Sequence, residues 1–158
     1  MSSTIHLTTI INAPVERVFD LSRSINLHKI STANTKEEAV AGVMTGLIKL
    51  NETVTWQAKH LFKLRRFTSK ITAMEKPVHF VDEMIQGDFK SFRHEHHFKV
   101  VNNGTIMIDQ VAFEMPYGML GKVLGSLYLR KYLHTLLSQR NKVIKEYAES
   151  QQWKVILN

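Results

Sequence analysis

The C-terminal third of the sequence constrains the fold most, because a helical pattern of about thirty residues follows Pro116 without a break. Large apolar residues recur there mostly three or four positions apart, which places them on one broad stripe of an α-helix. These residues are Leu120, Val123, Leu124, Leu127, Leu133, Leu136, Leu137, Val143, Ile144 and Tyr147. We expect one helix from Gly118 to Ser150, roughly 45 Å long. A helix with so long an apolar face requires a large partner surface.

The preceding hundred residues predict that surface, because apolar and polar residues alternate in seven segments typical of β-strands. The expected strands are residues 4–11, 37–43, 52–62, 67–73, 79–86, 91–101 and 106–115. After the first strand, Asn12 and Pro14 are expected to begin one short helix, with Asn12 as its N-cap, and a second is expected near residues 27–30. The sequence therefore predicts a single α+β domain over residues 1–158 with the helix-grip order. About seven curved antiparallel strands would wrap around the long C-terminal helix.

Asn103-Gly104 lies between two alternating segments and is a strong hairpin signal. A turn at these two residues pairs positions whose numbers sum to 207. Three pairs would then lie opposite each other: His94 with Phe113, His96 with Val111, and Phe98 with Asp109.

Basic residues exceed acidic ones, with 21 Lys and Arg against 14 Asp and Glu and a net charge of +7. One basic cluster is expected at the tip of a hairpin with a four-residue turn at 63–66, which would pair Phe62 with Phe67. It contains Lys59, Lys63, Arg65, Arg66 and Lys70. A second lies on the long helix and contains Lys122, Arg130, Lys131, Arg140, Lys142 and Lys145. We interpret both as solvated surfaces, although they also suit an anionic membrane or nucleic acid.

The sequence contains no cysteine, which excludes disulfides and thiolate chemistry. We find no secretory signal pattern and no apolar run of transmembrane length, so the expected location is the cytoplasm. No cofactor and no specific nucleic-acid partner are expected, and the expected oligomeric state is a monomer or homodimer.

Several segments resemble the SRPBCC superfamily of ligand-binding proteins, which includes START and birch-pollen-allergen-like proteins. They are residues 11–20 (INAPVERVFD), 52–56 (ETVTW), 80–84 (FVDEM), 92–98 (FRHEHHF) and 115–121 (MPYGMLG), together with Asp109. The resemblance is to a small bacterial branch labelled cell division inhibitor or polyketide cyclase-like. Asn51 and Lys63 stand where this branch is expected to have glycine, which concerns turn geometry. The resemblance implies a curved sheet that wraps the helix and leaves a ligand cavity between them.

His94 and His96 are two positions apart on a strand, so both side chains point to one face. The expected register adds Asp109 to that face, and His60 shares it if Trp56 points inward. These groups could hydrogen-bond each other, orient a ligand head group, or act as a general acid and base through His94, His96 and Asp109. We expect no metal, because only His60 or Asp109 is available as a further ligand. Whether Asp82 or Glu83 points inward is left open.

The leading hypothesis is a non-enzymatic protein that binds a small hydrophobic or amphipathic molecule, such as a lipid, a polyketide or an aromatic compound. The expected ligand-binding residues are Trp56, His60, Phe92, His94, His96, Phe98, Asp109, Val111, Phe113, Leu120, Leu124 and Leu127. The first alternative is a cyclase/aromatase-type enzyme that uses His94, His96 and Asp109. The second is peripheral binding of an anionic membrane or nucleic acid through the basic clusters.

Overall fold

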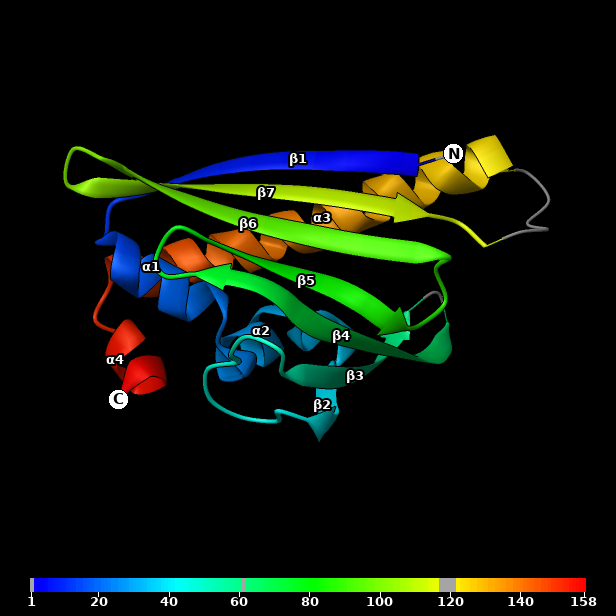
Figure 1. The fold of residues 1–158 in the computed structure, drawn as a ribbon, viewed down its shortest axis with the longest axis horizontal. Helices are drawn as coiled ribbons and strands as arrows, with labels where there is room; N and C mark the ends of the chain where they lie inside the picture. The colour runs from blue at the N-terminus through cyan, green and yellow to red at the C-terminus, as the bar shows by residue number, and fades with distance from the viewer. Residues whose placement is uncertain (1, 61, 117–121) are drawn as a thin grey trace.

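A seven-stranded antiparallel sheet packs along the long helix α3 in the computed structural model, which describes residues 2–60, 62–116 and 122–158 (Figure 1). The strands lie in the order β1-β7-β6-β5-β4-β3-β2. Their bounds are β1 Ser2–Ile11, β2 Glu38–Gly42, β3 Thr53–His60, β4 Lys63–Glu75, β5 His79–Gln86, β6 Ser91–Val101 and β7 Gly104–Glu114. The helices are α1 Val15–Ser22, α2 Ile25–Ser31, the 3-10 turn η1 Ala33–Thr35, α3 Lys122–Glu149 and α4 Trp153–Leu157. The predicted helix-grip α+β fold is confirmed.

The first short helix after β1 is capped differently from the expectation. Pro14, not Asn12, is the N-cap residue of α1, and its side chain makes no capping hydrogen bond. The backbone N–H of Asn12 instead donates to Glu149 Oε2 at 2.9 Å, which joins the start of this segment to the end of α3. At α2 the hydroxyl of Ser24 accepts from the backbone N–H of Leu27 at 3.1 Å, a standard N-terminal cap.

Most of the apolar core lies where α1 and α2 cover the sheet beside the C-terminal half of α3. Phe19 of α1 meets Phe80 and Phe98 edge-on, with ring centroids 5.5 Å and 5.2 Å away. Ile144 of α3 belongs to the same cluster. The short helix α4 was not predicted, and it is joined to α1 through Arg17, whose guanidinium lies 4.3 Å from the Trp153 ring centroid.

The predicted register of the β6–β7 hairpin is wrong by one residue on each strand. The turn lies at Asn102 and Asn103, so His94 is opposite Val111, His96 opposite Asp109 and Phe98 opposite Met107. Asn102 adopts the left-handed conformation, with φ of 52°, which asparagine tolerates better than most residues. The inward set of residues is unchanged, because both members of each pair still point to the same face.

The predicted four-residue turn at 63–66 is also wrong. His60 pairs with Lys63, so the connection between β3 and β4 is only residues 61–62, and Phe67 is opposite Trp56 rather than Phe62. Phe62 has a φ of 66° and is 96% exposed. Because the two strands continue to this short turn, the basic residues Lys63, Arg65 and Arg66 lie within β4 and not in the turn.

Of the predicted helix from Gly118 to Ser150, the part from Lys122 to Glu149 is confirmed, and residues 118–121 lie outside the described residues. No helix among the described residues is long and apolar enough to cross a membrane.

Candidate functional site

A cavity of about 350 Å³ lies between the inner face of the sheet and the helices α2 and α3. Five of the predicted site residues line it: Trp56, His60, Phe92, His94 and His96. The remaining wall is largely apolar and includes Phe67 and Ile71 of β4 and Leu133 and Leu137 of α3. Charged residues also line the cavity, namely Arg23, Glu37, Arg65, Arg66, Asp82, Asp88 and Arg140.

Other predicted site residues do not line the cavity. Phe98, Asp109, Val111 and Phe113 are buried within the core. Leu127 is 57% exposed, because it precedes Leu133 by six positions and is therefore about 120° away around the helix. Leu120 lies outside the described residues, as does the side chain of Leu124. The leucines of α3 that do line the cavity are Leu129, Leu133, Leu136 and Leu137.

A buried cluster of histidines and carboxylates occupies one part of the cavity wall. His94 and His96 of β6 stack with ring centroids 3.7 Å apart. His94 Nε2 lies 2.7 Å from Asp109 Oδ1, and His96 Nε2 lies 2.7 Å from Asp82 Oδ2. His96 Nδ1 is 3.3 Å from the same oxygen of Asp109. The strand register explains the arrangement, because Asp82 of β5 is opposite His94 and Asp109 of β7 is opposite His96.

Helix α3 contributes two further polar residues to the cluster. Asn141 Nδ2 donates to Asp109 Oδ2 at 2.7 Å, and Arg140 Nη1 lies 3.4 Å from Asp109 Oδ1. Arg140 Nη2 also donates to Ser22, with its backbone oxygen at 3.1 Å and its hydroxyl at 2.9 Å. The prediction that Arg140 belongs to an outward basic face is therefore wrong, since the residue is only 6% exposed. Its position four residues before Ile144, on the apolar stripe, was the available signal.

The sequence left open whether Asp82 or Glu83 points inward, and in the structure Asp82 does. Glu83 points to the other face of the sheet, where its Oε1 lies 3.1 Å from Arg93 Nη1. His60 also faces the cavity, but its Nδ1 is hydrogen-bonded to the Tyr132 hydroxyl at 2.8 Å. The three predicted histidines thus divide into a pair that contacts Asp109 and a separate one, His60, that contacts Tyr132.

The charges of the cluster follow from its burial and its hydrogen bonds. Burial opposes ionisation of Asp109, but hydrogen bonds from His94 and His96 and the charge of Arg140 outweigh it and hold the pKa of Asp109 well below its ordinary value. Burial likewise opposes ionisation of Asp82, and the hydrogen bond from His96 and the nearby charges lower the pKa of Asp82. Both carboxylates are therefore ionised at neutral pH.

The ring of His94 presents one unpaired nitrogen to the cavity. Burial lowers the pKa of His94, and its neighbour His96 lowers it further, so the neutral ring predominates at neutral pH. Because Asp109 is ionised and can only accept, the proton is on Nε2 and Nδ1 has a free lone pair. Asp82 Oδ2 lies 4.0 Å from Nδ1, which is beyond hydrogen-bonding distance. Among the described residues every fully buried side-chain polar atom has a partner, so Nδ1 is accessible from the cavity.

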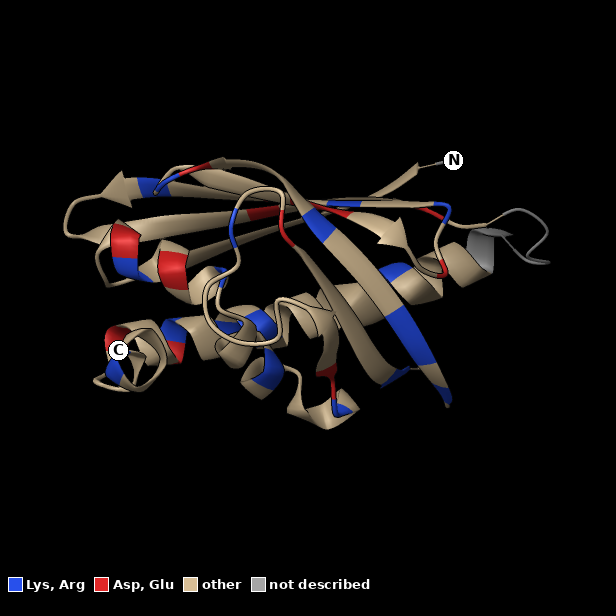
Figure 2. Ribbon diagram, turned by 60° about the horizontal axis from the view of Figure 1, so that its bottom comes forward, with Lys and Arg blue, Asp and Glu red and all other residues tan. Residues whose placement is uncertain are grey.

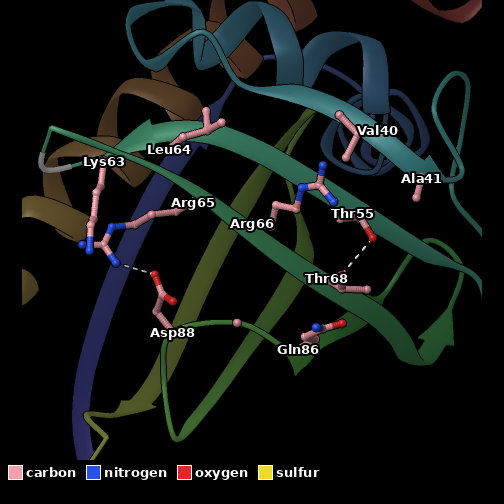
Figure 3. Close-up of a pocket in the computed structure, with 11 residues that line it drawn as sticks. Val40, Ala41, Thr55, Lys63, Leu64, Arg65, Arg66, Thr68, Gln86 and Asp88 are labelled. Carbon is pink, nitrogen blue, oxygen red and sulfur yellow. Dashed lines mark hydrogen bonds and ion pairs between the residues drawn. The ribbon is translucent and has the colours of Figure 1, made fainter.

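A second hollow, of about 600 Å³, lies on the outer face of the sheet over β2, β3, β4 and β5 (Figure 3). Two of its three basic residues have partners: Arg65 Nη1 is 2.6 Å from Asp88 Oδ2, and Arg66 Nε donates to Gln57 at 2.9 Å. Figure 2 shows several Lys and Arg along β4, but also acidic residues interspersed over the molecule. This surface is therefore a mixed one rather than an uninterrupted basic patch.

The sheet, the helix α3 across it and the cavity between them define a helix-grip protein. No protein-family model matches the sequence, and no curated protein matches it. Solved structures do match over almost the whole chain. The ZhuI aromatase/cyclase from a Streptomyces species matches with a TM-score of 0.77 and 10% identity over 94% of each chain.

Two further structures are similar. A protein from Thermus thermophilus matches with a TM-score of 0.71 and 18% identity over 90% of this chain and 97% of the other. A START superfamily protein from Mycobacterium smegmatis matches with a TM-score of 0.69 and 12% identity over 92% of this chain and 97% of the other. The chain therefore has the fold of the SRPBCC superfamily, as the resemblance of its sequence segments predicted.

Proposed function

We propose that the chain binds a small hydrophobic or amphipathic molecule in the cavity between the sheet and α3. The observation that supports this most is the cavity itself, which has a volume of about 350 Å³ and is lined mainly by apolar surface. Cavities that bind small molecules have this size, are mainly apolar and contain a few placed polar groups. The START superfamily protein and the aromatase/cyclase with the same fold are consistent with such a role.

The chemistry of the cavity wall favours a ligand with a hydrogen-bond donor at one end. His94 Nδ1 has a free lone pair, and Asp82 beside it is an ionised carboxylate, so both groups accept. Phe92, Leu133 and Leu137 surround the remaining space with apolar surface. A hydroxyl-bearing aliphatic or aromatic molecule fits this combination, which includes lipid, polyketide and aromatic alcohols.

A pair of matched probes tests this proposal on the wild-type chain. A medium-chain aliphatic alcohol and its methyl ether have similar apolar parts, but only the alcohol can donate to His94. We expect both to raise the melting temperature with concentration, because a ligand that binds only the folded state stabilises it, and we expect the alcohol to bind more tightly. Calorimetric titration measures both dissociation constants. If neither probe binds, and a wider set of phenols and fatty alcohols also gives no shift, the proposal is wrong.

A second candidate is an enzyme of the cyclase/aromatase type, which the pairing of His94 with Asp109 favours. A carboxylate that fixes one ring nitrogen and leaves the other directed into a cavity is the arrangement of a general base. The test is His94→Gln assayed with aromatic polyketide-like ketones. An enzyme loses turnover while it still binds the ketone, whereas a binding protein shows no turnover in the wild type either.

A further inference from the structure

We propose that Asp82, His94 and His96 bind a divalent transition-metal ion at the cavity wall, with open coordination positions directed into the cavity. This inference does not depend on the proposed ligand-binding function. It concerns the same wall but needs no organic ligand.

The three side chains each offer one ligand atom, and these atoms lie within 4.8 Å of one another. His96 Nε2 is 2.7 Å from Asp82 Oδ2, and His94 Nδ1 is 4.0 Å from the same oxygen. Ligands about 2.0–2.2 Å from a tetrahedral ion lie about 3.4 Å apart. Metal binding would lengthen the His96–Asp82 distance by about 0.7 Å and shorten the His94–Asp82 distance by about 0.6 Å. Small rotations of the side chains can supply both changes.

The other nitrogens of the two rings provide an independent indication. His94 Nε2 and His96 Nδ1 both lie beside one oxygen of Asp109, at 2.7 Å and 3.3 Å. Both rings therefore direct one nitrogen to a buried carboxylate and the other toward Asp82. Histidines that bind metals almost always show this second contact, because it fixes the orientation of the ring and strengthens the ligating nitrogen. Because one carboxylate oxygen lies beside both rings, the other nitrogens, His94 Nδ1 and His96 Nε2, both lie toward Asp82.

The backbone holds this geometry rigidly, because all the participating residues lie within paired strands. His94 and His96 are on β6, with Asp82 opposite His94 on β5 and Asp109 opposite His96 on β7. Arg140 from α3 restrains the cluster through its contacts with Asp109 and Ser22, and its Nη2 also lies 3.4 Å from His96 Nδ1. A site on central strands is more exactly positioned than one on loops.

The ligand set indicates which ions fit. Two imidazoles and one carboxylate suit Zn²⁺, Fe²⁺, Co²⁺ and Ni²⁺, whereas Mg²⁺ and Ca²⁺ prefer oxygen ligands. Three protein ligands leave at least one coordination position, and this position faces the cavity because Asp82, His94 and His96 all line it. A ligand with a carboxylate, hydroxyl or ketone would bind the ion there.

Direct titration of the wild-type chain tests the proposal without any substitution. After removal of metals with a chelator, Co²⁺ is added and the visible absorption is recorded, followed by equilibrium dialysis against Zn²⁺. We expect one equivalent of each ion per chain and the intense absorption bands of four- or five-coordinate Co²⁺ with nitrogen ligands. No stoichiometric binding of either ion to the folded wild type would overturn the proposal.

Matched variants then locate the ion among the eight histidines of the chain. We expect Asp82→Asn to weaken Zn²⁺ binding at least tenfold, and Asp109→Asn to weaken it about 10- to 100-fold through the ring orientation. The control is His97→Gln, because His97 is next to His96 on β6 but points to the other face, where its Nε2 is 3.2 Å from Glu95. Equal weakening in the control, or unchanged binding in folded Asp82→Asn, would assign the ion to surface histidines and overturn the proposal.

The two proposals fail separately. Circular dichroism confirms that each variant is folded, and the alcohol probe is titrated into metal-free wild-type protein. A chain that binds the alcohol but no metal contradicts only the metal site, whereas one that binds metal but no alcohol or phenol contradicts only the ligand cavity.

Discussion

Asp109 is the residue on which most of the buried polar contacts converge. It is 1% exposed, and its two oxygens lie within hydrogen-bonding or ion-pair distance of His94, His96, Arg140 and Asn141. Asp109→Asn keeps the size of the side chain but removes the buried carboxylate that pairs with the guanidinium of Arg140. We expect a loss of about 3–5 kcal/mol in the free energy of unfolding, measured by urea denaturation.

The matched control for Asp109→Asn is Asp88→Asn. Asp88 also pairs with an arginine, at 2.6 Å from Arg65, but its side chain is 57% exposed. Exposed ion pairs contribute about 0–1 kcal/mol, so this variant should unfold within that range of the wild type. Similar losses in both variants would contradict the role assigned to Asp109.

Glu37, which lies outside the cluster of His94 and His96, leads to a prediction about how stability depends on pH. Burial opposes its ionisation, but the charge of His28, the hydrogen bond from that residue and the charge of His60 outweigh it, so the pKa of Glu37 lies below its ordinary 4.5. A depressed pKa stabilises the folded state above pH 4.5, and this contribution is lost as the pH falls through the lower, folded-state pKa. A hydrogen bond from the Thr32 side chain also lowers the pKa of Glu37.

We therefore expect Glu37→Gln to be less stable than the wild type at pH 5.5 and the difference to shrink toward pH 3. Urea denaturation at several pH values measures this difference directly. A difference that stays constant between pH 5.5 and pH 3 would show that Glu37 is not the titrating group.

At the scale of single residues, the sequence predicted side-chain direction better than contacts. The two-residue spacing of His94 and His96 was sufficient to place both on one face, and the structure agrees. The partner Asp82 was undecided, because the turn after β5 and thus the register of β5 on β6 was uncertain. Arg140 was assigned to solvent from its charge, although its helical phase placed it beside Ile144.

At the scale of elements, hairpin turns account for the main errors. The β6–β7 turn lies one residue earlier than Asn103-Gly104, and the β3–β4 turn is two residues rather than four. Several turns are compatible with the same alternating strands, and their backbone energies differ little. An error of one residue on each strand preserves the inward faces, so the inner wall was still predicted while individual neighbours such as Met107 opposite Phe98 were not.

Helix α3 contains Gly125, which offers a prediction at the same scale. A methyl group at this position would meet no atom within 4 Å. Glycine within a helix costs about 1 kcal/mol relative to alanine, so Gly125→Ala should raise the free energy of unfolding by about 0.5–1 kcal/mol.

The control for Gly125→Ala is Gly42→Ala in β2. Gly42 has a φ of +72°, and a Cβ there would lie 2.2 Å from the backbone oxygen of Thr53, so this variant should be destabilised. Thermal unfolding followed by circular dichroism measures both. A decrease of the melting temperature in Gly125→Ala would contradict the open space described at this part of α3.

At the scale of the whole molecule, the sequence predicted the arrangement but not how completely the core is filled. A sheet with one apolar face and a helix with one apolar stripe must cover each other, and they do so here. A cavity, however, is the small difference between the enclosed volume and the volume of many side chains. It depends on the curvature of the sheet and on which leucines face inward, and Leu127 shows that one error in helical phase changes the lining.

Enlarging a cavity-lining side chain tests whether this volume is truly available. Leu133 of α3 lines the cavity. In a close-packed core, Leu133→Trp would cost about 1–3 kcal/mol through overpacking. In a cavity of about 350 Å³ the added ring has space and buries apolar surface, so the variant should be at least as stable as the wild type. The same ring would occupy the ligand volume, so the melting-temperature shift caused by the alcohol probe should disappear.

Leu127→Trp is the matched control, because Leu127 is on the same helix and is exposed. It should keep both the wild-type stability and the response to the alcohol. Urea denaturation and thermal shift on both variants separate the possibilities. A destabilised Leu133→Trp that still responds to the alcohol would mean that the core is filled at this position and that the ligand binds elsewhere. A stable Leu133→Trp variant that no longer responds to the alcohol would mean that the cavity has space for the added ring and that the alcohol binds in it.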